Sequence, residues 1–587
     1  MIRILPEHIA NKIAAGEVVE RPASVVKELV ENSIDSGASR IFVETSGGGV
    51  KLIKVTDDGS GMSPDDALLA FERHATSKLD SGDGLFSIST MGFRGEALPS
   101  IASVSRFRLI TSTGDGRGTS VSIEGGNIHG VKEIGAPKGA AAEVRDLFFN
   151  TPARLKFLKS RETELSHIAA SVERLALAHP EIHFRLINDG KELLDCPPVR
   201  GLLERIAQVY GRDFARWLSE IKAGGPCRIY GFVSMPGRSF SDRSRQESFV
   251  NRRPVKDRVI QRAIYDAYES LLMKERHPAS ILFIDIEPSL VDVNVHPAKR
   301  EVRFSDATGV QRAIKEAVTG ALKNSENAEA EAFAESGMVR EVQAPFDNIS
   351  FHVTLPTWRG GQAEGRVGGG RGTEGEHQEK IPLHAERDAA PSRYTEPFHE
   401  FPMQVLDSYI IARSEDGFIL IDQHAAHERI QYEKVKARYG RQGEVSQGLL
   451  VPERIELTAK EAALLEAVLP ELKTLGIEAE AFGGGSFLIR SKPLFLDKAD
   501  IKEVVLGIAG ELESADVKGR ADELREKICK SVACKSAVKA GKKLHPHAME
   551  RLIEQLFACE MPYTCAHGRP TVIKFGLNEL EKMFKRK

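Results

Sequence analysis

The sequence predicts an α/β protein built from several domains. A chain of 587 residues is too long for one hydrophobic core, and the usual size of about 100–200 residues per domain indicates three or four domains. Before residue 324, helical patterns such as residues 22–36 alternate with strand patterns such as residues 40–56. After residue 398, residues 401–421 have the pattern of a strand pair with a turn at 415–417, as in a small α/β domain.

One long segment interrupts this pattern. Between residues 324 and 398 the apolar periodicity is lost, and a glycine-rich run is followed by charged residues and prolines. Such a composition offers too few apolar side chains to offset the entropy of ordering. We therefore predict a flexible linker at 324–398, two domains before it (1–206 and 207–323) and one after it (399–587), with helices at 460–475 and 499–515 in the last.

The composition is ordinary for a soluble globular protein, with 41% hydrophobic and 28% charged residues. A formal net charge of −3 does not indicate nucleic-acid binding, although a sum over the chain can hide local basic patches. The N-terminus lacks the apolar stretch of a signal peptide, and no apolar run is long enough to span a bilayer. These features predict a cytosolic protein.

The first candidate site lies in the predicted helix at residues 22–36. Glu28 and Asn32 are four residues apart and therefore share one face of that helix. A carboxylate beside an amide can hold a water molecule and a hydrated Mg²⁺ together. The alternative is the solvated acidic side of an amphipathic helix.

Two glycine-containing segments follow. Asp57 ends a predicted strand and is followed by Asp-Gly-Ser-Gly, where the glycines would let the backbone approach a ligand and the carboxylate could accept a hydrogen bond from an amino group. A plain turn is the alternative. Residues 91–98, Met-Gly-Phe-Arg-Gly-Glu-Ala-Leu, could close over phosphates through backbone N–H groups. The second segment has neither Walker A nor Rossmann spacing.

A possible metal site lies near the C-terminus, where residues 422–433 read Asp-Gln-His-Ala-Ala-His-Glu-Arg-Ile-Gln-Tyr-Glu. On a helix, His424 and Glu428 share a face, whereas Glu433 is rotated away and would have a supporting role. Cys565 and His567 are separated by one residue and would point the same way on an extended segment. Nitrogen, oxygen and sulfur ligands together are typical of Zn²⁺.

The cysteines allow two interpretations. Four of the six lie after residue 528, which favours a local metal or redox role over a disulfide framework. Cys534 could add a further thiolate ligand. Each thiol could instead be a small buried hydrophobe, and we expect that of Cys529 and Cys559.

A basic stretch, residues 249–258, could contact DNA phosphates. Its arginines and lysine follow a predicted strand, and no aromatic residues are interleaved for base stacking. Binding here would use backbone charge with little sequence preference, with Arg253 and Arg258 as the candidate contacts. The alternative is a solvated charged face.

Several longer motifs resemble the MutL-type DNA mismatch-repair proteins, a group within the GHKL ATPases that also include gyrase, Hsp90 and histidine kinases. They are residues 9–22 (Ile-Ala-Asn-Lys-Ile-Ala-Ala-Gly-Glu-Val-Val-Glu-Arg-Pro), 73–78 (Arg-His-Ala-Thr-Ser-Lys), 148–154 (Phe-Phe-Asn-Thr-Pro-Ala-Arg) and 295–302 (Val-His-Pro-Ala-Lys-Arg-Glu-Val). The resemblance covers essentially the whole chain outside the linker. It implies a GHKL ATPase sandwich, an S5-like second α/β domain and a C-terminal α/β dimerisation and endonuclease domain.

For the N-terminal half, the resemblance implies an ATP site with Mg²⁺. Glu28 would be the general base, Asn32 the Mg²⁺ ligand and Asp57 the residue that recognises the adenine amino group. Lys299 would reach the γ-phosphate from the second domain, so that it senses the nucleotide state. The family usually has Gly-Thr in the region where this chain has Gly139-Ala140-Ala141, and an alanine at 140 or 141 removes a hydroxyl, which puts one contact in doubt. The residues implied to line the pocket are Gly59, Gly61, Gly92, Phe93, Arg94 and Gly95.

For the C-terminal half, residues 422–433 resemble the endonuclease motif of the MutL subset that nicks DNA. Residues 533–535, 565–570 and 584–586 resemble its accompanying motifs, with Ala566 where Pro or Asn is usual. The implied chemistry is metal-assisted phosphodiester hydrolysis with Zn²⁺, Mn²⁺ or both. The implied catalytic residues are Asp422, His424 and Glu428, and the implied metal ligands are His424, Glu428, Cys534, Cys565 and His567.

The resemblance also implies partners. They are a second copy of the chain bound through the C-terminal domain, DNA, the mismatch sensor MutS and the sliding clamp, in a bacterial cytoplasm near the nucleoid. The clamp would bind a short peptide with Gln447, Leu450, Val451 and Pro452, for which an ordinary strand ending in proline is the alternative. Two rival functions are a non-catalytic ATP-switched matchmaker with a structural metal, and a GHKL chaperone or topoisomerase subunit, which the C-terminal cluster disfavours.

Overall fold

The computed structural model describes residues 19–335 and 402–586. Gaps fall at 73–74, 76–94, 226, 236, 241, 269–270, 273–275 and 293–301 in the first part. In the second part they fall at 415–416, 439–445, 494–495, 497–500, 514–525, 527 and 534–542. Within these described ranges, no helix is long and apolar enough to cross a membrane.

The first domain is a two-layer sandwich. Its described strands form an eight-stranded sheet in the order β5-β4-β3-β6-β2-β1-β7-β8, in which β1 and β7 run parallel and the other pairs are antiparallel. Buried residues alternate with partly exposed ones along β1, as expected for a sheet with one covered face. The strands are β1 (Arg40–Ser46), β2 (Leu52–Asp57), β3 (Arg106–Ser112), β4 (Arg117–Glu124), β5 (Asn127–Gly135), β6 (Gly139–Arg145), β7 (His183–Asn188) and β8 (Lys191–Cys196).

Helices form the other layer of this domain. The predicted helix at 22–36 is α2 (Pro22–Asp35), which begins with proline at a position where the missing N–H costs nothing. Its buried valines and leucine pack with α6 (Arg161–Ala178) and the sheet in one hydrophobic core. The predicted strand region at 40–56 is the β1–β2 hairpin. Shorter helices are α3 (Pro64–Leu69), α4 (Ala97–Ser103), α5 (Pro152–Phe157) and α7 (Leu202–Tyr210).

The second domain is a smaller sheet covered by two helices. The order of its described strands is β12-β11-β13-β10-β9, and β11 pairs parallel with β13. Helices α9 and α10 close its core. The elements are α8 (Arg212–Ala215), β9 (Leu218–Ala223), β10 (Arg228–Ser234), β11 (Gln246–Val250), β12 (Arg253–Val255), α9 (Arg258–Ala267), β13 (Ser280–Asp285), β14 (Val291–Asp292), β15 (Arg303–Phe304) and α10 (Ala307–Glu335).

Helix α10 corrects the predicted start of the linker. We predicted an unstructured segment from residue 324, but α10 continues to Glu335. The residues concerned, Asn-Ser-Glu-Asn-Ala-Glu-Ala-Glu-Ala-Phe-Ala-Glu, lack apolar periodicity but are rich in alanine and glutamate, which have high helix propensity. A helix that has already begun can extend through them at low cost because each further residue adds one hydrogen bond.

The C-terminal region contains two separate sheets. The first, in the order β16-β17-β18-β22 among the described strands, packs against α11 and α15. The second, in the order β19-β21-β20, packs against α12 and α13. The elements are β16 (Met403–Val405), β17 (Tyr409–Ser414), β18 (Gly417–Asp422), α11 (Gln423–Arg438), β19 (Ser446–Glu456), α12 (Ala459–Thr474), β20 (Glu478–Gly483), β21 (Ser486–Pro493), α13 (Ile501–Glu513), α15 (Pro546–Phe557), β22 (Val572–Gly576) and α16 (Leu577–Met583).

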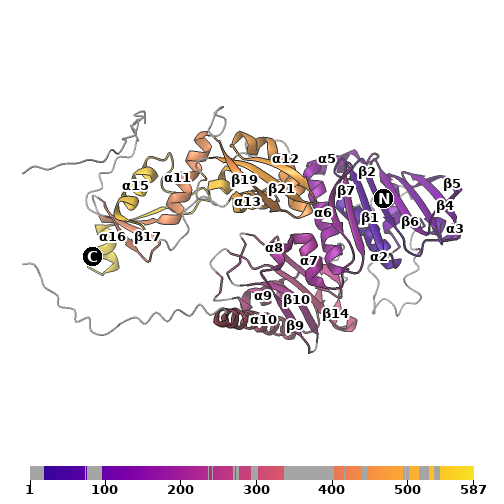
Figure 1. The fold of residues 1–587 in the computed structure, drawn as a ribbon, viewed down its shortest axis with the longest axis horizontal. Coiled ribbons are helices and arrows are strands. Elements are labelled where there is room, and N and C mark those ends of the chain that lie inside the picture. Colours follow the sequence, from indigo (N-terminus) through magenta and orange to yellow (C-terminus); the bar gives the residue numbers. More distant parts are fainter. Residues whose placement is uncertain are drawn as a thin grey trace, which may run out of the picture.

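The helices predicted at 460–475 and 499–515 correspond to α12 and α13, and the predicted strand pair corresponds to β17 and β18. The second C-terminal sheet lies beside the first domain, where α12 packs along α6 (Figure 1). The first C-terminal sheet, with α11 and α15, lies at the far end of the molecule (Figure 1).

Candidate functional site

The carboxyl group of the strand-end aspartate in the first domain, Asp57, is held by three hydrogen bonds. The Ser33 hydroxyl donates to Asp57 Oδ2 at 2.7 Å, and the backbone N–H groups of Gly59 and Ala140 donate to Oδ1 at 3.0 and 3.3 Å. Burial raises the pKa of Asp57, and these three hydrogen bonds only partly oppose that effect. A half-buried carboxyl held in this way can accept a hydrogen bond from a ligand amino group at the edge of the sheet.

The glycines next to Asp57 are required by close backbone approach. A Cβ at Gly61, where φ is +68°, would lie 1.9 Å from the Ser112 carbonyl oxygen. A Cβ at Gly59 would lie 1.9 Å from Ser36 Oγ, and one at Gly139 would lie 2.1 Å from the Asp57 carbonyl oxygen. The turn predicted as the alternative is therefore part of a tightly packed loop. Ala140 reaches this loop through its backbone, so the absent hydroxyl does not remove its contact with Asp57.

Helix α2 brings the predicted acidic face to the same place. Ser33, which binds Asp57, lies one residue after Asn32 on α2, so the helix and the end of β2 are joined directly. The side chain of Glu28 is 19% exposed, and its Oε1 lies 3.5 Å from Lys27 Nζ. Lys27 is also 3.4 Å from Glu31. Glu28 is thus partly buried yet open to solvent, as a residue that contacts a bound water would need to be.

Part of the predicted nucleotide pocket cannot be placed. Gly92, Phe93, Arg94 and Lys299 lie outside the described residues, and Gly95 is the first described residue after position 94. Gly95 has a φ of +63°, and a Cβ there would lie 2.4 Å from the carbonyl oxygen of Ala75. The roles predicted for these five residues stay predictions.

The two arginines predicted to contact DNA differ in environment. Arg258 begins α9 and is exposed, as phosphate contact requires. Arg253 is only 8% exposed, and burial lowers its pKa while Glu31, Asp35 and Glu28 oppose that effect. Because its guanidinium lies near acidic side chains of α2 rather than open to solvent, a phosphate contact by Arg253 is disfavoured. The basic stretch at 249–258 does not reveal from sequence alone which of its arginines is buried and which is exposed.

In the C-terminal region, Asp422 begins the helix that carries the predicted metal ligands. Its Oδ1 accepts hydrogen bonds from the backbone N–H groups of His424 and Ala425 at 2.9 and 3.0 Å, which is the geometry of a helix cap. Helix α11 then places His424 Nε2 3.3 Å from Glu428 Oε1, as the four-residue spacing predicts.

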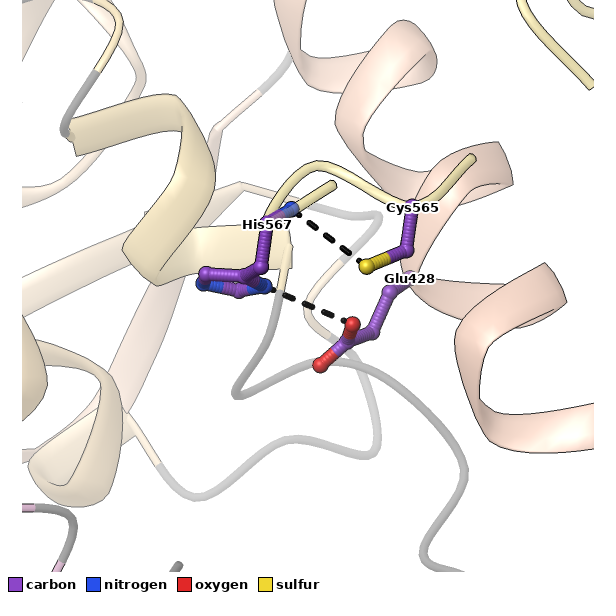
Figure 2. Close-up of side chains that lie close together, drawn as sticks. All are labelled: Glu428, Cys565 and His567. Carbon is purple, nitrogen blue, oxygen red and sulfur yellow. Dashed lines mark hydrogen bonds and ion pairs between the residues drawn. The ribbon is translucent and has the colours of Figure 1, made fainter. Parts of the chain in front are cut away.

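Glu428, Cys565 and His567 come together at α11. One ligand atom from each lies within 4.8 Å of the others, and among the described residues this is the group suited to a metal ion. Figure 2 shows the three side chains pointing toward one another, with Glu428 on the helix and the other two on the loop before β22. His567 Nδ1 is 3.5 Å from Glu428 Oε2, and the His567 backbone N–H donates to Cys565 Sγ at 3.3 Å.

The charges in this cluster support one another. Burial of Glu428, which is 2% exposed, would raise its pKa, but hydrogen bonds from His424 and His567 outweigh burial and lower it. Hydrogen bonds with Cys565 and Glu428 raise the pKa of His567 to about 10. For Cys565, burial is again outweighed by its contacts with His567, and the thiol pKa is lowered. The group can therefore present an anionic oxygen and a thiolate to a cation.

Two further side chains of α11, Arg429 and Glu433, hold the loop that carries Cys565 and His567. No role for Arg429 was predicted from the sequence. Buried Arg429 donates to the carbonyl oxygens of Thr564 and Cys565 at 2.5 and 2.9 Å. Glu433 accepts hydrogen bonds from the backbone N–H groups of Glu560 and Met561 at 2.8 and 3.2 Å. Glu433 thus has the supporting position predicted for it. The spacing of Arg429 carried no signal, because its partners are carbonyl groups more than 100 residues away.

Of the other C-terminal cysteines, the two that the structure describes, Cys529 and Cys559, take no part in this group. Cys529 and Cys559 are buried, and burial raises their pKa to about 11 and about 12. Both therefore behave as small hydrophobic residues, as expected. Cys534 lies outside the described residues, so its predicted role as a ligand stays a prediction.

The predicted clamp-binding peptide lies on an irregular edge strand. The register of β19 against β21 shifts between Gly448 and Glu453, so the residues between them form a bulge. Leu450 and Val451 in that bulge are 102% and 75% exposed. An ordinary strand would not leave two adjacent apolar side chains uncovered in this way.

The comparisons with known proteins agree with this architecture. Three family models match: "Histidine kinase-, DNA gyrase B-, and HSP90-like ATPase" at residues 20–145, "DNA mismatch repair protein, C-terminal domain" at 206–323, and "MutL C terminal dimerisation domain" at 403–544. Among solved structures, the Aquifex aeolicus MutL ATPase domain complexed with ADP is 28% identical, with a TM-score of 0.37, and covers 51% of this chain and 98% of that one.

The fold and these family matches define a GHKL ATPase domain followed by an S5-like domain and a C-terminal dimerisation domain. Curated DNA mismatch repair proteins MutL match along the full length. That of Geobacter sulfurreducens is 42% identical over 100% of this chain and 99% of its own, and that of Paramagnetospirillum magneticum is 41% identical over 100% of both. The chain belongs to the MutL family of DNA mismatch repair proteins, which confirms the predicted family. It is an ATP-binding repair protein with a domain for homodimerisation.

Proposed function

We propose that this repair protein is also a metal-dependent DNA endonuclease, in which an ATP-driven switch in the N-terminal domains is coupled to nicking by the C-terminal domain. The observation that carries the proposal is the convergence of Glu428, Cys565 and His567 at the start of α11. A solved ATPase domain among the similar structures comes from a protein described as a bacterial mismatch repair endonuclease, from Aquifex aeolicus.

The donor set fits a divalent metal. Glu428 Oε2 is buried, and its contact with His567 Nδ1 is long, at 3.5 Å, so the oxygen keeps a lone pair available for an ion. Glu428, Cys565 and His567, with His424 beside them, supply the oxygen, sulfur and nitrogen ligands that Zn²⁺ accepts, and Cys534 is a further candidate. A divalent ion here would lower the pKa of a bound water and polarise a phosphate. Zn²⁺, Mn²⁺ or both would supply this chemistry.

Asp422 and His424 would act beside the metal. Asp422 caps α11 with one carboxylate oxygen, Oδ1, which fixes the direction of the carboxyl group. Its second oxygen would then be available to a metal or to an attacking water. His424 holds Glu428 in its ionised state through the 3.3 Å contact, so that the ligand keeps its charge.

In the N-terminal domain, the proposed ATP site is centred on α2 and Asp57. Asp57 would accept a hydrogen bond from the adenine amino group, and Asn32 would bind Mg²⁺. The Gly59–Gly61 loop and residues 92–95 would surround the nucleotide. Glu28 would orient and deprotonate the attacking water, which its partial exposure permits. Lys299 would contact the γ-phosphate and report hydrolysis to the second domain.

The proposed partners follow from exposed features. The segment with Gln447, Leu450, Val451 and Pro452 would bind a sliding clamp, since an exposed apolar pair on an irregular edge strand is suited to a groove on another protein. Arg258 would contact DNA phosphates. Binding of the mismatch sensor MutS is proposed from family membership.

Nicking of supercoiled plasmid in the presence of Mn²⁺ tests the proposal. Asp422→Asn should abolish nicking without unfolding the domain, because asparagine caps helices about as well as aspartate but has no charge for a metal. Asp306→Asn is a matched control, since Asp306 caps α10 through Gly309 N–H at 2.8 Å and lies in the second domain. Nicking that survives in Asp422→Asn would leave the metal site with a structural role in a non-catalytic matchmaker.

A further inference from the structure

The N-terminal end of α12 is buried against two other domains. Although α12 belongs to the second C-terminal sheet, Ala459 and Ala463 are each 2% exposed and belong to the hydrophobic core of the first domain. Helix α12 packs along α6, which contributes to the same core (Figure 1). Residues far apart in the sequence therefore share one core, which is more than a surface contact.

A glutamate of the ATPase domain binds the first turn of α12. The backbone N–H of Lys460, which has no acceptor within its own helix at this position, donates to Glu173 Oε1 at 3.0 Å. Glu173 lies on α6 and is 5% exposed. Thr458 and Glu461 form a capping box at the same helix end, so α12 begins here independently of the contact.

An arginine of the second domain binds the same turn. Arg245 Nη2 lies 2.5 Å from Glu461 Oε1, and both side chains are largely buried, at 11% and 13% exposed. The Arg245 guanidinium also lies over the ring of Tyr210 at 5.0 Å. Removing one partner of such a buried pair leaves an uncompensated charge, so the pair is much more sensitive to substitution than an exposed ion pair.

Peripheral contacts extend the interface without determining it. Lys191 of β8 lies 3.5 Å from Glu466, and Lys502 of α13 lies 3.4 Å from Asp213. Lys191 and Asp213 are 71% and 64% exposed, so solvent screens both pairs. The specificity of the interface must therefore come from the buried contacts of Glu173 and Arg245.

We propose that the first turn of α12 is a clip that docks in cis across the junction between the ATPase domain and the second domain. Glu173 and Arg245 lie on different domains, yet both bind within two residues of α12, Lys460 and Glu461. The clip therefore fits only while these two domains keep this mutual arrangement. The partly buried Arg174–Glu247 pair, at 3.1 Å, also links the two domains. A rearrangement of the two domains would release the C-terminal region.

Hydrogen exchange of the full-length protein tests the clip. The Lys460 amide should be protected only while α12 is docked, because its acceptor is Glu173. Glu173→Ala and Arg245→Gln should each raise exchange in the 458–464 peptide by about tenfold or more, since each loss of about 1.4 kcal/mol is a factor of ten. Neither substitution alters the sequence of α12.

Matched controls exclude general destabilisation. Glu164→Ala removes another buried α6 glutamate that accepts a backbone hydrogen bond, from Lys159 at 2.9 Å, and should leave the 458–464 peptide unchanged. Arg490→Gln removes an exposed ion pair with Glu480, at 2.5 Å, in the sheet that packs against α12. It should also leave exchange in the 458–464 peptide unchanged. Ala463→Glu, which alters only the docked face of α12, should behave like Glu173→Ala even if the ATPase-domain variant folds poorly.

The clip is ruled out if the 458–464 peptide exchanges equally in the wild type, Arg245→Gln and Ala463→Glu. Docking in cis is tested separately by lysine cross-linking of mixed dimers made from light and heavy isotope-labelled chains. Cross-links between β8 and α12, such as Lys191 to Lys460, should join peptides of the same label. Mixed-label products would instead place α12 on the partner copy and overturn docking in cis.

Discussion

At the scale of residues, the metal centre depends on charges that the protein itself maintains. Glu428 is buried, but His424 and His567 keep it ionised, and Arg429 holds the loop that carries Cys565. The spacing of His424 and Glu428 could be recognised in the sequence because helical geometry alone brings them together. The approach of Cys565 and His567 could not be derived from spacing, because it depends on β22 pairing with β18 and on backbone contacts by Arg429 and Glu433.

The raised pKa of His567 predicts proton release on metal binding. Without metal, hydrogen bonds hold the pKa of His567 at about 10, so at neutral pH the ring is protonated. A metal binds the neutral ring, so binding must release this proton, and affinity should rise by about tenfold per pH unit below that pKa. Calorimetric titration with Zn²⁺ in buffers of different protonation enthalpy measures the release. Heats independent of the buffer would contradict the assignment of His567 as a ligand.

The close packing around Gly61 predicts that a side chain at this position is not tolerated. Gly61→Ala should abolish ATP binding and destabilise the ATPase domain, because the added Cβ meets the Ser112 carbonyl oxygen at 1.9 Å in addition to backbone strain at φ +68°. Gly190→Ala is the control, with φ +79° and no atom within 4 Å of the added Cβ. Gly190→Ala should lower the free energy of unfolding only by the cost of backbone strain, about 1–2 kcal/mol. Equal unfolding free energies for the two variants would show that the close approach at Gly61 has no effect.

At the scale of elements, helices with strong local signals were predicted well. Helix α2 and the β1–β2 hairpin follow from periodicity, and α12 follows from its apolar pattern and capping box. The end of α10 was predicted too early because residues 324–335 lack an apolar stripe. Their alanine and glutamate content nevertheless favours continuing a helix that has already begun. The bulge in β19 has no periodic signal, since it is defined by the register of β21 opposite.

If the bulge in β19 binds the sliding clamp, a substitution there should weaken clamp binding without destabilising the domain. Leu450→Ser should weaken binding to the sliding clamp, measured by surface plasmon resonance, and should change the unfolding free energy by less than about 0.5 kcal/mol because Leu450 is fully exposed. Phe482→Ser, at a residue 63% exposed on β20 of the same sheet, should leave clamp affinity unchanged. Equal losses for both variants would mean that the bulge is not the binding segment.

At the scale of the whole molecule, a buried ionisable group, Glu173, lies where the C-terminal region contacts the ATPase domain. Burial raises the pKa of Glu173 to about 7, although Lys460 and Arg245 lower it and Glu461 raises it. A carboxyl group that is released to water should return to its usual pKa of about 4. The docked state therefore binds the proton more tightly than the released state does, and the two states must respond differently to pH.

This difference predicts weaker docking at higher pH. Because the docked pKa is the raised one, the contribution of Glu173 to docking is complete below about pH 4 and is lost as the pH rises through about 7. Solution X-ray scattering should show a larger radius of gyration at about pH 8 than at about pH 6. In Glu173→Gln, which can still accept the Lys460 hydrogen bond, the radius should not vary with pH. The same variation in wild type and Glu173→Gln would exclude Glu173 as the cause.

The central claim is that Glu428 binds the metal that supports nicking. The direct measurement is the rate of plasmid nicking as Mn²⁺ is titrated, for the wild type and for Glu428→Gln, which nearly preserves the shape of the side chain but removes its charge. We expect nicking that rises with Mn²⁺ in the wild type, loss of nicking in Glu428→Gln, and the same ATPase rate in both. Equal nicking rates at every Mn²⁺ concentration would contradict the account.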